Sequence, residues 1–297
     1  MKIDAQKRDG NKVSLEISED YASFEKAAAQ TLAEAAKEVT LPGFRAGKAP
    51  KEMVEKVMKR EAIEAEAAQK LISDLYPKII TEAKLEPVDY PEVELVQLAA
   101  DKPFIFKLAV AVYPEVKLGK YKGLKVTKKA VAVTEEEILK VLGNLQERFA
   151  PGGADLNDEF ASKVSRFGTL AELKEELRQA MLKDREAESE ADLKNQLIAG
   201  ASAETKVEIP KGMIDREVNI MLDELRGSLA QSNLTLEDYL KGIKKEDATL
   251  REELKKSAEI RVKGKVVLRA IAEMEKLTIE PAEIEAELTA MAAESGQ

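Results

Sequence analysis

Hydrophobic residues in the amino-terminal part of the chain follow two successive periods. Apolar residues alternate with polar ones on both sides of Asp9-Gly10, which predicts a β-hairpin closed by a tight glycine turn. From Tyr21 to Val39 the apolar positions recur every three or four residues, which predicts a helix with Ser18 as its cap. Pro42-Gly43 cannot continue that helix, so we expect it to end there.

The helical period then resumes in two segments. Residues 51–60 place apolar side chains on one face and cations on the other, and residues 63–79 carry apolar residues at a spacing of four. Pro77 lies inside the second segment and removes a backbone hydrogen bond, so we expect a bend near Leu75.

Two further strands are predicted by alternating apolar residues in 93–98 and 104–112, on either side of a turn at 101–103. Together with the hairpin and the helices they predict a small α+β domain over residues 1–112. Residues 113–133 follow it, and 113–129 have no helical period, which indicates an extended linker.

The rest of the chain, residues 134–297, has the pattern of helices joined by short turns. Thr134 with Glu137 and Thr169 with Glu172 form capping boxes, which mark two helix starts. Further helices are predicted to begin near Pro210, Thr235, Leu250 and Pro281. The chain is therefore predicted to be mostly α, an elongated two-domain protein whose carboxy-terminal helical domain forms arms.

Composition supports long, solvent-exposed helices, because 35% of the residues are charged and only 4% are aromatic. The net charge of −9 argues against a general nucleic-acid-binding protein. A local basic patch between residues 43 and 60 could still contact RNA. Its cations are Arg45, Lys48, Lys51, Lys56, Lys59 and Arg60.

The chain has no cysteine, histidine or tryptophan. Disulfides, thiolate zinc sites and nucleophilic sites that use histidine are therefore excluded. Residues 43–48 lack the spacing of a phosphate-binding loop, and Glu135-Glu136-Glu137 point around a helix and cannot converge on one ion. We therefore expect no cofactor, no metal and no catalytic residue.

The beginning of the sequence has no apolar leader, and no run of some 18 apolar residues occurs anywhere in it. These features predict a cytoplasmic protein without a membrane partner.

The segment LPGFRAGKAP, residues 41–50, lies between two helical patterns and interrupts them with two prolines and two glycines. Its glycines allow positive φ and its prolines fix φ, which predicts a tight, exposed loop. Phe44, Arg45 and Lys48 lie on that loop, and we interpret it as a docking tip. The alternative is that Phe44 folds back onto the following helix.

GFRAGK, with Pro50 two residues further on, resembles the ribosome-binding signature of the bacterial trigger factor family. The resemblance continues through PEVKLGKYKGLKV, DLNDEFASKV and IPKGMIDREVNIMLDEL. It implies ribosome-binding roles for Gly43, Phe44, Arg45, Gly47, Lys48 and Pro50.

The partners implied by this resemblance are the large ribosomal subunit near the tunnel exit, through ribosomal protein and RNA phosphate, and nascent or unfolded polypeptides. The family's function is that of an ATP-independent chaperone. A weak homodimer away from the ribosome is also implied.

The family carries an FK506-binding-type prolyl isomerase domain between the helix that ends here near Arg148 and the segment DLNDEF. In this chain only residues 150–154 stand there, too few to hold a prolyl pocket. We therefore expect no isomerase activity. The family also continues with more helix beyond the position of Gln297, so we expect a shortened second arm.

Five methionines, the last of them Met291, lie on the carboxy-terminal helices, and their flexible thioethers suit a surface that accepts many apolar sequences. The candidate client-binding residues are Met181, Met213, Met221, Leu225 and Met274. Each of them is also compatible with ordinary core packing. Two rival functions remain at this point, a helical scaffold that binds one folded partner and a prolyl isomerase.

Overall fold

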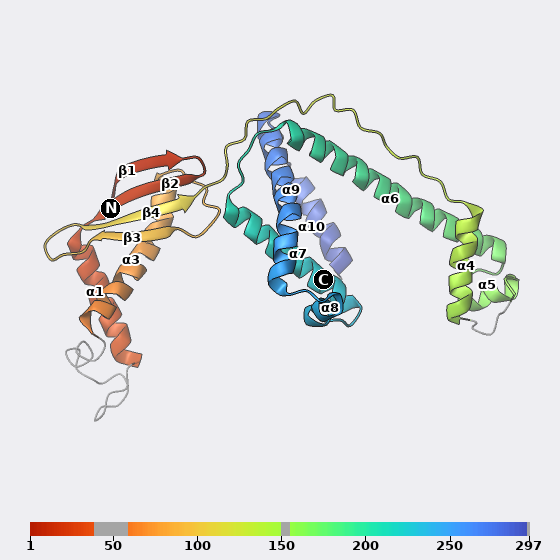
Figure 1. The fold of residues 1–297 in the computed structure, drawn as a ribbon, viewed down its shortest axis with the longest axis horizontal. Coiled ribbons are helices and arrows are strands. Elements are labelled where there is room, and N and C mark those ends of the chain that lie inside the picture. Colours follow the sequence, from red (N-terminus) through yellow and green to blue (C-terminus); the bar gives the residue numbers. More distant parts are fainter. Residues whose placement is uncertain (39–58, 150–154, 296–297) are drawn as a thin grey trace. The chain divides into compact units, whose positions relative to one another are not determined.

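A computed structural model describes residues 1–38, 59–149 and 155–295 of the chain. The fold is mostly helical with one small antiparallel sheet, as the sequence predicts (Figure 1). The described residues form two compact units. The first contains residues 1–116 and 207–266, and the second contains residues 117–206 and 267–297.

The sheet of the first unit has four strands in the order β1-β2-β4-β3, with all neighbours antiparallel. The strands are β1 Lys2–Asp9, β2 Lys12–Glu19, β3 Glu92–Gln97 and β4 Phe104–Ala111. The predicted hairpin and the later strand pair are confirmed. Gly10 makes the hairpin turn with φ of 56°, a conformation that favours glycine.

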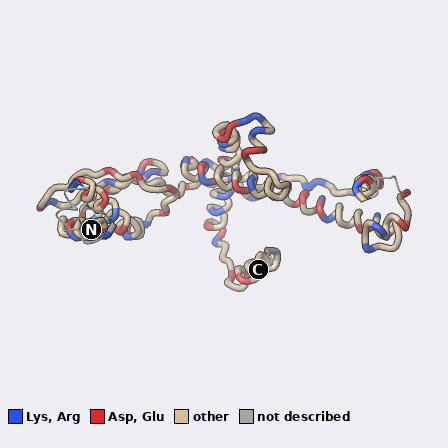
Figure 2. The backbone as a smooth tube through the Cα atoms, turned by 90° about the horizontal axis from the view of Figure 1, so that it is seen from below, with Lys and Arg blue, Asp and Glu red and all other residues tan. Residues whose placement is uncertain are grey.

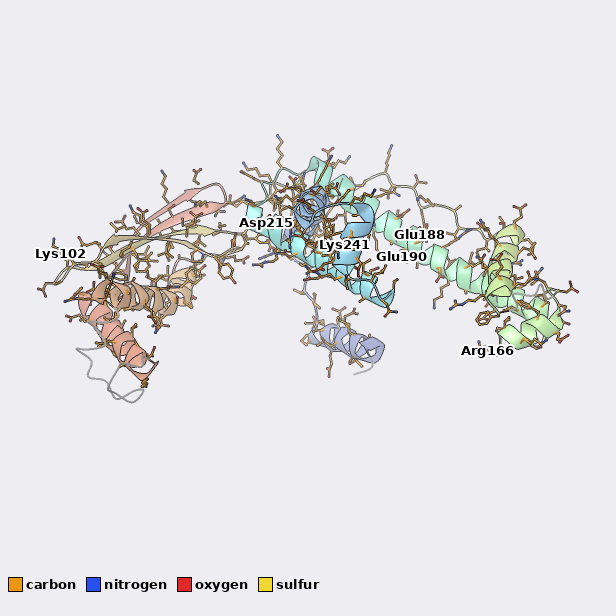
Figure 3. The ribbon with its side chains drawn as sticks, turned by 60° about the horizontal axis from the view of Figure 1, so that its bottom comes forward. Lys102, Arg166, Glu188, Glu190, Asp215 and Lys241 are labelled. Atoms are coloured by element: carbon orange, nitrogen blue, oxygen red, sulfur yellow. The ribbon has the colours of Figure 1, made fainter. Side chains whose placement is uncertain are left out.

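Helices α1 (Tyr21–Glu38) and α3 (Arg60–Glu82) cover one face of this sheet (Figures 1 and 3). The buried side chains of β2 and β4 alternate with exposed ones, so one face of the sheet forms the core under the two helices. Phe104 stacks on Phe24 with ring centroids 5.5 Å apart. Every buried residue of this core lies between Val13 and Val112.

The predicted cap of the first helix is wrong. Ser18 lies in β2, where it pairs with Lys2 and Ile105, and α1 begins at Tyr21. The strand continues past Ser18 because its hydrogen-bond ladder with β4 extends to Glu19. Pro77 does lie inside α3, and the Thr81 hydroxyl donates to its carbonyl over 2.8 Å. The predicted bend there stays a prediction.

The remainder of the first unit is helical. It contains α7 (Lys211–Gln231), α8 (Leu236–Ile243) and most of α9 (Asp247–Met274). A small core joins them through Val218, Leu222, Leu250 and Ala258. Glu217 on α7 is buried. Its carboxylate forms ion pairs with two cations of α9, Lys265 over 2.6 Å and Arg261 over 3.1 Å.

The second unit contains α4 (Glu135–Phe149), α5 (Asp158–Val164), α6 (Leu170–Glu204) and α10 (Pro281–Ser295). Both predicted capping boxes are present, at Thr134 with Glu137 and at Thr169 with Glu172. Helix α5 is not predicted by the sequence patterns. Asn157 caps it by accepting from the Phe160 backbone N–H, and Phe160 packs with Ile138 of α4.

The predicted linker has no helix, and it is tied along α6 within this unit (Figure 1). Lys117 and Lys206 exchange two backbone hydrogen bonds of 3.2 Å. Further along, the Ser189 hydroxyl donates to the Lys129 carbonyl over 2.9 Å. Because the contacts move down α6 as the linker advances, the two segments run antiparallel. We call residues 117–133 the strap.

Acidic and basic residues are interspersed along the chain (Figure 2). Helix α6 carries exposed acids such as Glu188 and Glu190 (Figure 3). Ser189 between them is buried against the strap. Within the ranges that the structure describes, no helix combines the length and the apolar character needed to cross a bilayer.

Candidate docking and client-binding surfaces

The predicted docking tip and the basic patch fall mostly in residues 39–58, outside the described residues. The structure describes the two helices on either side of that segment, α1 and α3. Of the patch cations it describes Lys59 and Arg60, and both are exposed at the start of α3. Arg60 forms an ion pair with Glu64 over 2.7 Å.

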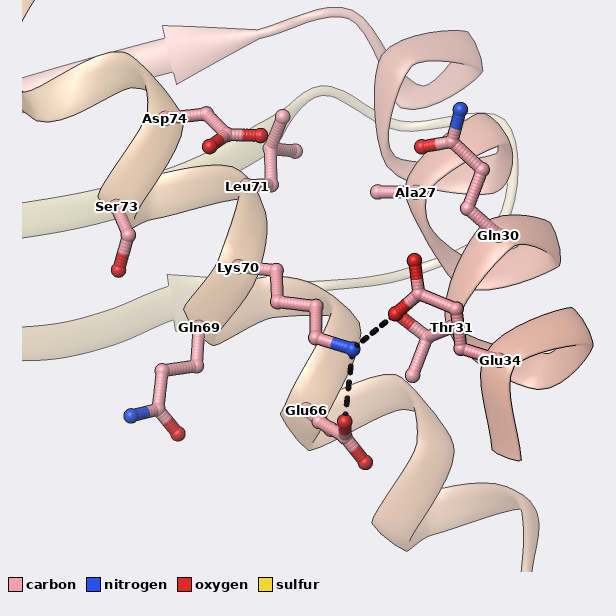
Figure 4. Close-up of a pocket in the computed structure, with 10 residues that line it drawn as sticks. All are labelled: Ala27, Gln30, Thr31, Glu34, Glu66, Gln69, Lys70, Leu71, Ser73 and Asp74. Atoms are coloured by element: carbon pink, nitrogen blue, oxygen red, sulfur yellow. Dashed lines mark hydrogen bonds and ion pairs between the residues drawn. The ribbon is translucent and has the colours of Figure 1, made fainter. Parts of the chain in front are cut away.

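Helices α1 and α3 are held together by an ion bridge above their shared core. Lys70 of α3 lies 2.8 Å from Glu34 of α1 and 2.9 Å from Glu66 one turn away (Figure 4). Hydrogen bonds to Glu34 and then to Glu66 raise the pKa of Lys70, and Lys70 in turn lowers the pKa of Glu34. These charges are exposed to solvent, so they contribute little to the stability of the helix pair.

A groove of about 530 Å³ runs between these helices beside the bridge. Polar and charged residues line most of it, among them Gln30, Thr31, Gln69 and Asp74 (Figure 4). Such a lining does not suit an apolar client, because burying these groups without partners would cost free energy. We therefore do not assign this groove to client binding.

The predicted client-binding residues lie in different surroundings. Met221 and Leu225 are partly buried against the core of α7, α8 and α9, and Met213 is partly buried at the start of α7. Met181 is partly buried against the core of α4, α5 and α6. Met274, at the end of α9, has 61% of its surface exposed. The structure thus brings Met221 and Leu225 to one core and leaves Met274 accessible.

A larger accessible apolar surface lies after Met274. The sequence reasoning noted Met291 of this surface and missed its other residues. On α10, Ile284, Leu288 and Met291 are 51%, 61% and 59% exposed and recur at spacings of four and three, so they share one face. Leu277 and Ile279 in the preceding turn are 68% and 70% exposed. We call these five residues the apolar stripe.

No buried core cluster of the described residues includes a residue of α10. Residues 277–293 also contain four glutamates and no lysine or arginine. The apolar stripe is therefore set in an acidic surround. Such a surface is suited to polypeptide segments that combine apolar and basic side chains. The repeat of Ile284, Leu288 and Met291 was visible in the sequence, but a packed helix has the same repeat.

No group of histidine, cysteine or carboxylate side chains that could hold a metal occurs within the described ranges. The acids Glu135 and Glu137 at the start of α4 are instead engaged in ion pairs. Glu135 pairs with Lys174 and Arg178 over 2.8 Å, and Glu137 pairs with Arg185. These contacts attach α4 to α6.

Family models match most of the chain. The model described as "Bacterial trigger factor protein (TF)" matches residues 1–145, and "Bacterial trigger factor protein (TF) C-terminus" matches residues 169–297. Among solved structures, one described as "Promiscuous Substrate Recognition in Folding and Assembly Activities of the Trigger Factor Chaperone" has a TM-score of 0.57 and 18% identity. The match covers 91% of the chain in that structure and 100% of this chain. This likeness shows the fold.

Curated relatives agree with the family models. Trigger factor of Carboxydothermus hydrogenoformans is 32% identical over 382 residues, with 97% of this chain and 90% of the relative covered. Trigger factor of Bacillus subtilis is 29% identical over 387 residues, with 98% and 91% covered. Both matched stretches are longer than the 297 residues of this chain, so each relative holds residues there that this chain lacks.

These matches span both predicted parts of the chain and agree with its mostly helical fold and small sheet. They support a chaperone function in protein folding, with unfolded and nascent chains as partners. The chain belongs to the bacterial trigger factor family.

Proposed function

We propose that this chain is an ATP-independent chaperone that docks on the ribosome and shelters nascent or unfolded chains in the cytoplasm. The observation that carries the client-binding part is the apolar stripe on α10 and the turn before it. Its five side chains are each more than half exposed, and burying them against a client would release free energy of about 25 cal/mol per Å² of apolar surface. Exposed apolar surface of this kind is typical of an interaction site.

For ribosome docking we propose Gly43, Phe44, Arg45, Gly47, Lys48 and Pro50, on the strength of the signature and of family membership. Arg45 and Lys48 would meet RNA phosphate and acidic side chains near the tunnel exit, and Phe44 would fill an apolar niche. Client binding would also use Met181, Met213, Met221, Leu225 and Met274. Away from the ribosome the chain would form a weak homodimer.

The domain organisation we propose is a docking domain of residues 1–112, a linker of 113–133 and a helical chaperone domain of 134–297, with a short junction at 150–154. It differs from the division into compact units, which groups residues 207–266 with residues 1–116. The first domain is supported by its core, whose buried residues all lie between Val13 and Val112. A fragment of residues 1–112 should therefore fold alone and still co-sediment with ribosomes. A folded fragment that stays in the supernatant would contradict this organisation.

We further propose that the chain is not a prolyl isomerase. The family models match on either side of residues 146–168 and leave only a short segment between them. The test measures two activities of the full chain, suppression of the aggregation of an unfolded client and acceleration of the cis/trans isomerisation of an X-Pro peptide. We expect suppression at stoichiometric protein and no acceleration. Acceleration of the isomerisation, or client aggregation that is not suppressed, would contradict the proposal. Tight binding of one folded partner would instead favour a scaffold function.

A further inference from the structure

The two edges of the amino-terminal sheet differ in how they are protected. Edge strand β1 has charged residues at five of its eight positions, Lys2, Asp4, Lys7, Arg8 and Asp9, which discourage pairing with another strand. Edge strand β3 has the sequence EVELVQ, with two charges that are both acidic. Val93, Leu95 and Val96 on it are 49%, 49% and 47% exposed.

Two of these side chains extend the core face of the sheet. Val93 lies opposite Leu108 and Leu95 lies opposite Phe106, and residues opposite each other share a face of an antiparallel sheet. Leu108 and Phe106 are fully buried, whereas their partners on β3 are half exposed. The core face therefore ends at β3 with apolar surface that the described residues leave uncovered.

The outer backbone edge of β3 is also open within the described ranges. Residues 92–97 pair with β4 on one side, and no other described backbone group bonds to them. A register shift after Leu95 limits the regular ladder to Glu92, Val93, Glu94 and Leu95. Four residues offer few hydrogen bonds, so an added strand would bind weakly and exchange readily.

We propose that the edge of β3 binds an extended segment of an unfolded polypeptide by β-augmentation, in the antiparallel direction that gives the more stable ladder. The segment would have apolar residues on the face that covers Val93 and Leu95. It would have basic residues on the other face, where Glu94 lies and where Glu92 already pairs with Lys12 of β2 over 2.7 Å. Backbone hydrogen bonds would provide affinity for any extended segment. The two faces of β3 would provide a preference for segments in which apolar and basic residues alternate. The proposal rests on the proposed chaperone function only for the source of the segment.

The probe for this site is a ten-residue peptide in which valine and lysine alternate. Its two matched controls carry N-methyl groups on the valines or on the lysines. Alternate N–H groups of a strand point to opposite edges, so each control blocks one edge of the peptide. We expect the full-length protein to bind the parent peptide and one control, and to bind the other control at least about tenfold more weakly.

Protein variants provide the second arm of the test. Leu95→Lys puts a charge on the uncovered apolar surface and should weaken peptide binding at least about tenfold. Gln6 lies opposite buried Leu15 at the other edge of the sheet, so Gln6→Lys is the matched control and should bind as the parent protein does. Peptide binding should also slow amide hydrogen exchange in residues 92–97. Circular dichroism checks that both variants are folded.

Equal binding of the two methylated peptides, or slowed exchange that leaves residues 92–97 unaffected, would overturn the proposal. Slowed exchange in β3 that grows with protein concentration in the absence of peptide would mean that a second copy occupies the edge, and would also overturn it. Failure of the parent peptide to bind, with client aggregation still suppressed, would refute this site and leave the proposed chaperone function intact.

Discussion

Gly119 of the strap lies so close to the backbone carbonyl of Glu204 that a β-carbon at position 119 would come within 2.0 Å of that oxygen. Next to it, the Gly119 N–H points to the buried Thr205 hydroxyl over 3.4 Å, and Lys117 pairs with Lys206. The end of the strap can approach the end of α6 this closely only without a side chain at position 119. This contact anchors the strap.

Gly119→Ala should therefore loosen the strap. The new methyl group would collide with backbone atoms, which cannot move aside as a side chain can, and we expect a cost of about 1–3 kcal/mol. Hydrogen exchange at the amides of Lys117 and Lys206 measures the effect directly and should become faster. Gly143→Ala in α4 is the matched control. Its β-carbon meets open space, and it should stabilise the helix by about 0.5–1 kcal/mol.

Substitutions in the apolar stripe should change client binding without changing the stability of the fold. Ile284→Ser with Leu288→Ser should weaken suppression of client aggregation, because each side chain offers about 1.5–3 kcal/mol when a client buries it fully. The melting curve should hardly change, because α10 contributes no residue to a described core. Leu222→Ala is the opposite control. Leu222 is fully buried, so its truncation should cost about 2–5 kcal/mol of stability.

The attachment of α4 to α6 should depend on pH. Hydrogen bonds from Arg185 and then from the Thr134 backbone lower the pKa of Glu137 from 4.5 to about 2. Because the pKa is lower in the folded protein, the stabilisation is fully present above pH 4.5 and is lost as the pH falls toward 2. Glu137→Gln should therefore be less stable than the parent protein at pH 6 and equally stable near pH 2. A difference that persists at pH 2 would contradict this ion-pair explanation.

A buried charge, the carboxylate of Glu217, lies between α7 and α9. Replacing Lys265 and Arg261 by Met would leave the Glu217 carboxylate buried without its cations, which should cost about 3–5 kcal/mol in urea unfolding. Adding Glu217→Met should restore most of that loss, because an apolar trio needs no charge partner. If the triple variant is as unstable as the double variant, packing and not charge explains the effect.

Local patterns were sufficient to predict most elements of this fold. Thr169 and Glu172 sit three residues apart at the start of α6, and their two reciprocal hydrogen bonds confirm the predicted helix start. The first hairpin was also predicted from local sequence, because the Gly10 turn and the alternating strands on either side of it lie within a few residues. The Ser18 cap was wrong because a long-range ladder with β4 kept Ser18 in a strand.

Contacts between distant segments could not be predicted. Nothing near Gly119 indicates that it meets Glu204, and the strap has no period that would reveal its course along α6. The exposure of apolar side chains could not be predicted from the sequence either. Ile284, Leu288 and Met291 repeat as core residues do, and only the structure distinguishes this bare face of α10 from the packed face of α7.

The most direct test of the account is ribosome co-sedimentation of the full chain over a range of salt concentrations, comparing the parent protein with the double variant Arg45→Ala and Lys48→Ala. We expect the double variant to bind more weakly and to depend less steeply on salt, because each lost phosphate contact removes about 0.7 to 0.9 from the slope of log affinity against log salt. Phe44→Ala should weaken binding and leave that slope unchanged. If all three proteins sediment with ribosomes equally at every salt concentration, residues 43–50 do not dock this chaperone on the ribosome.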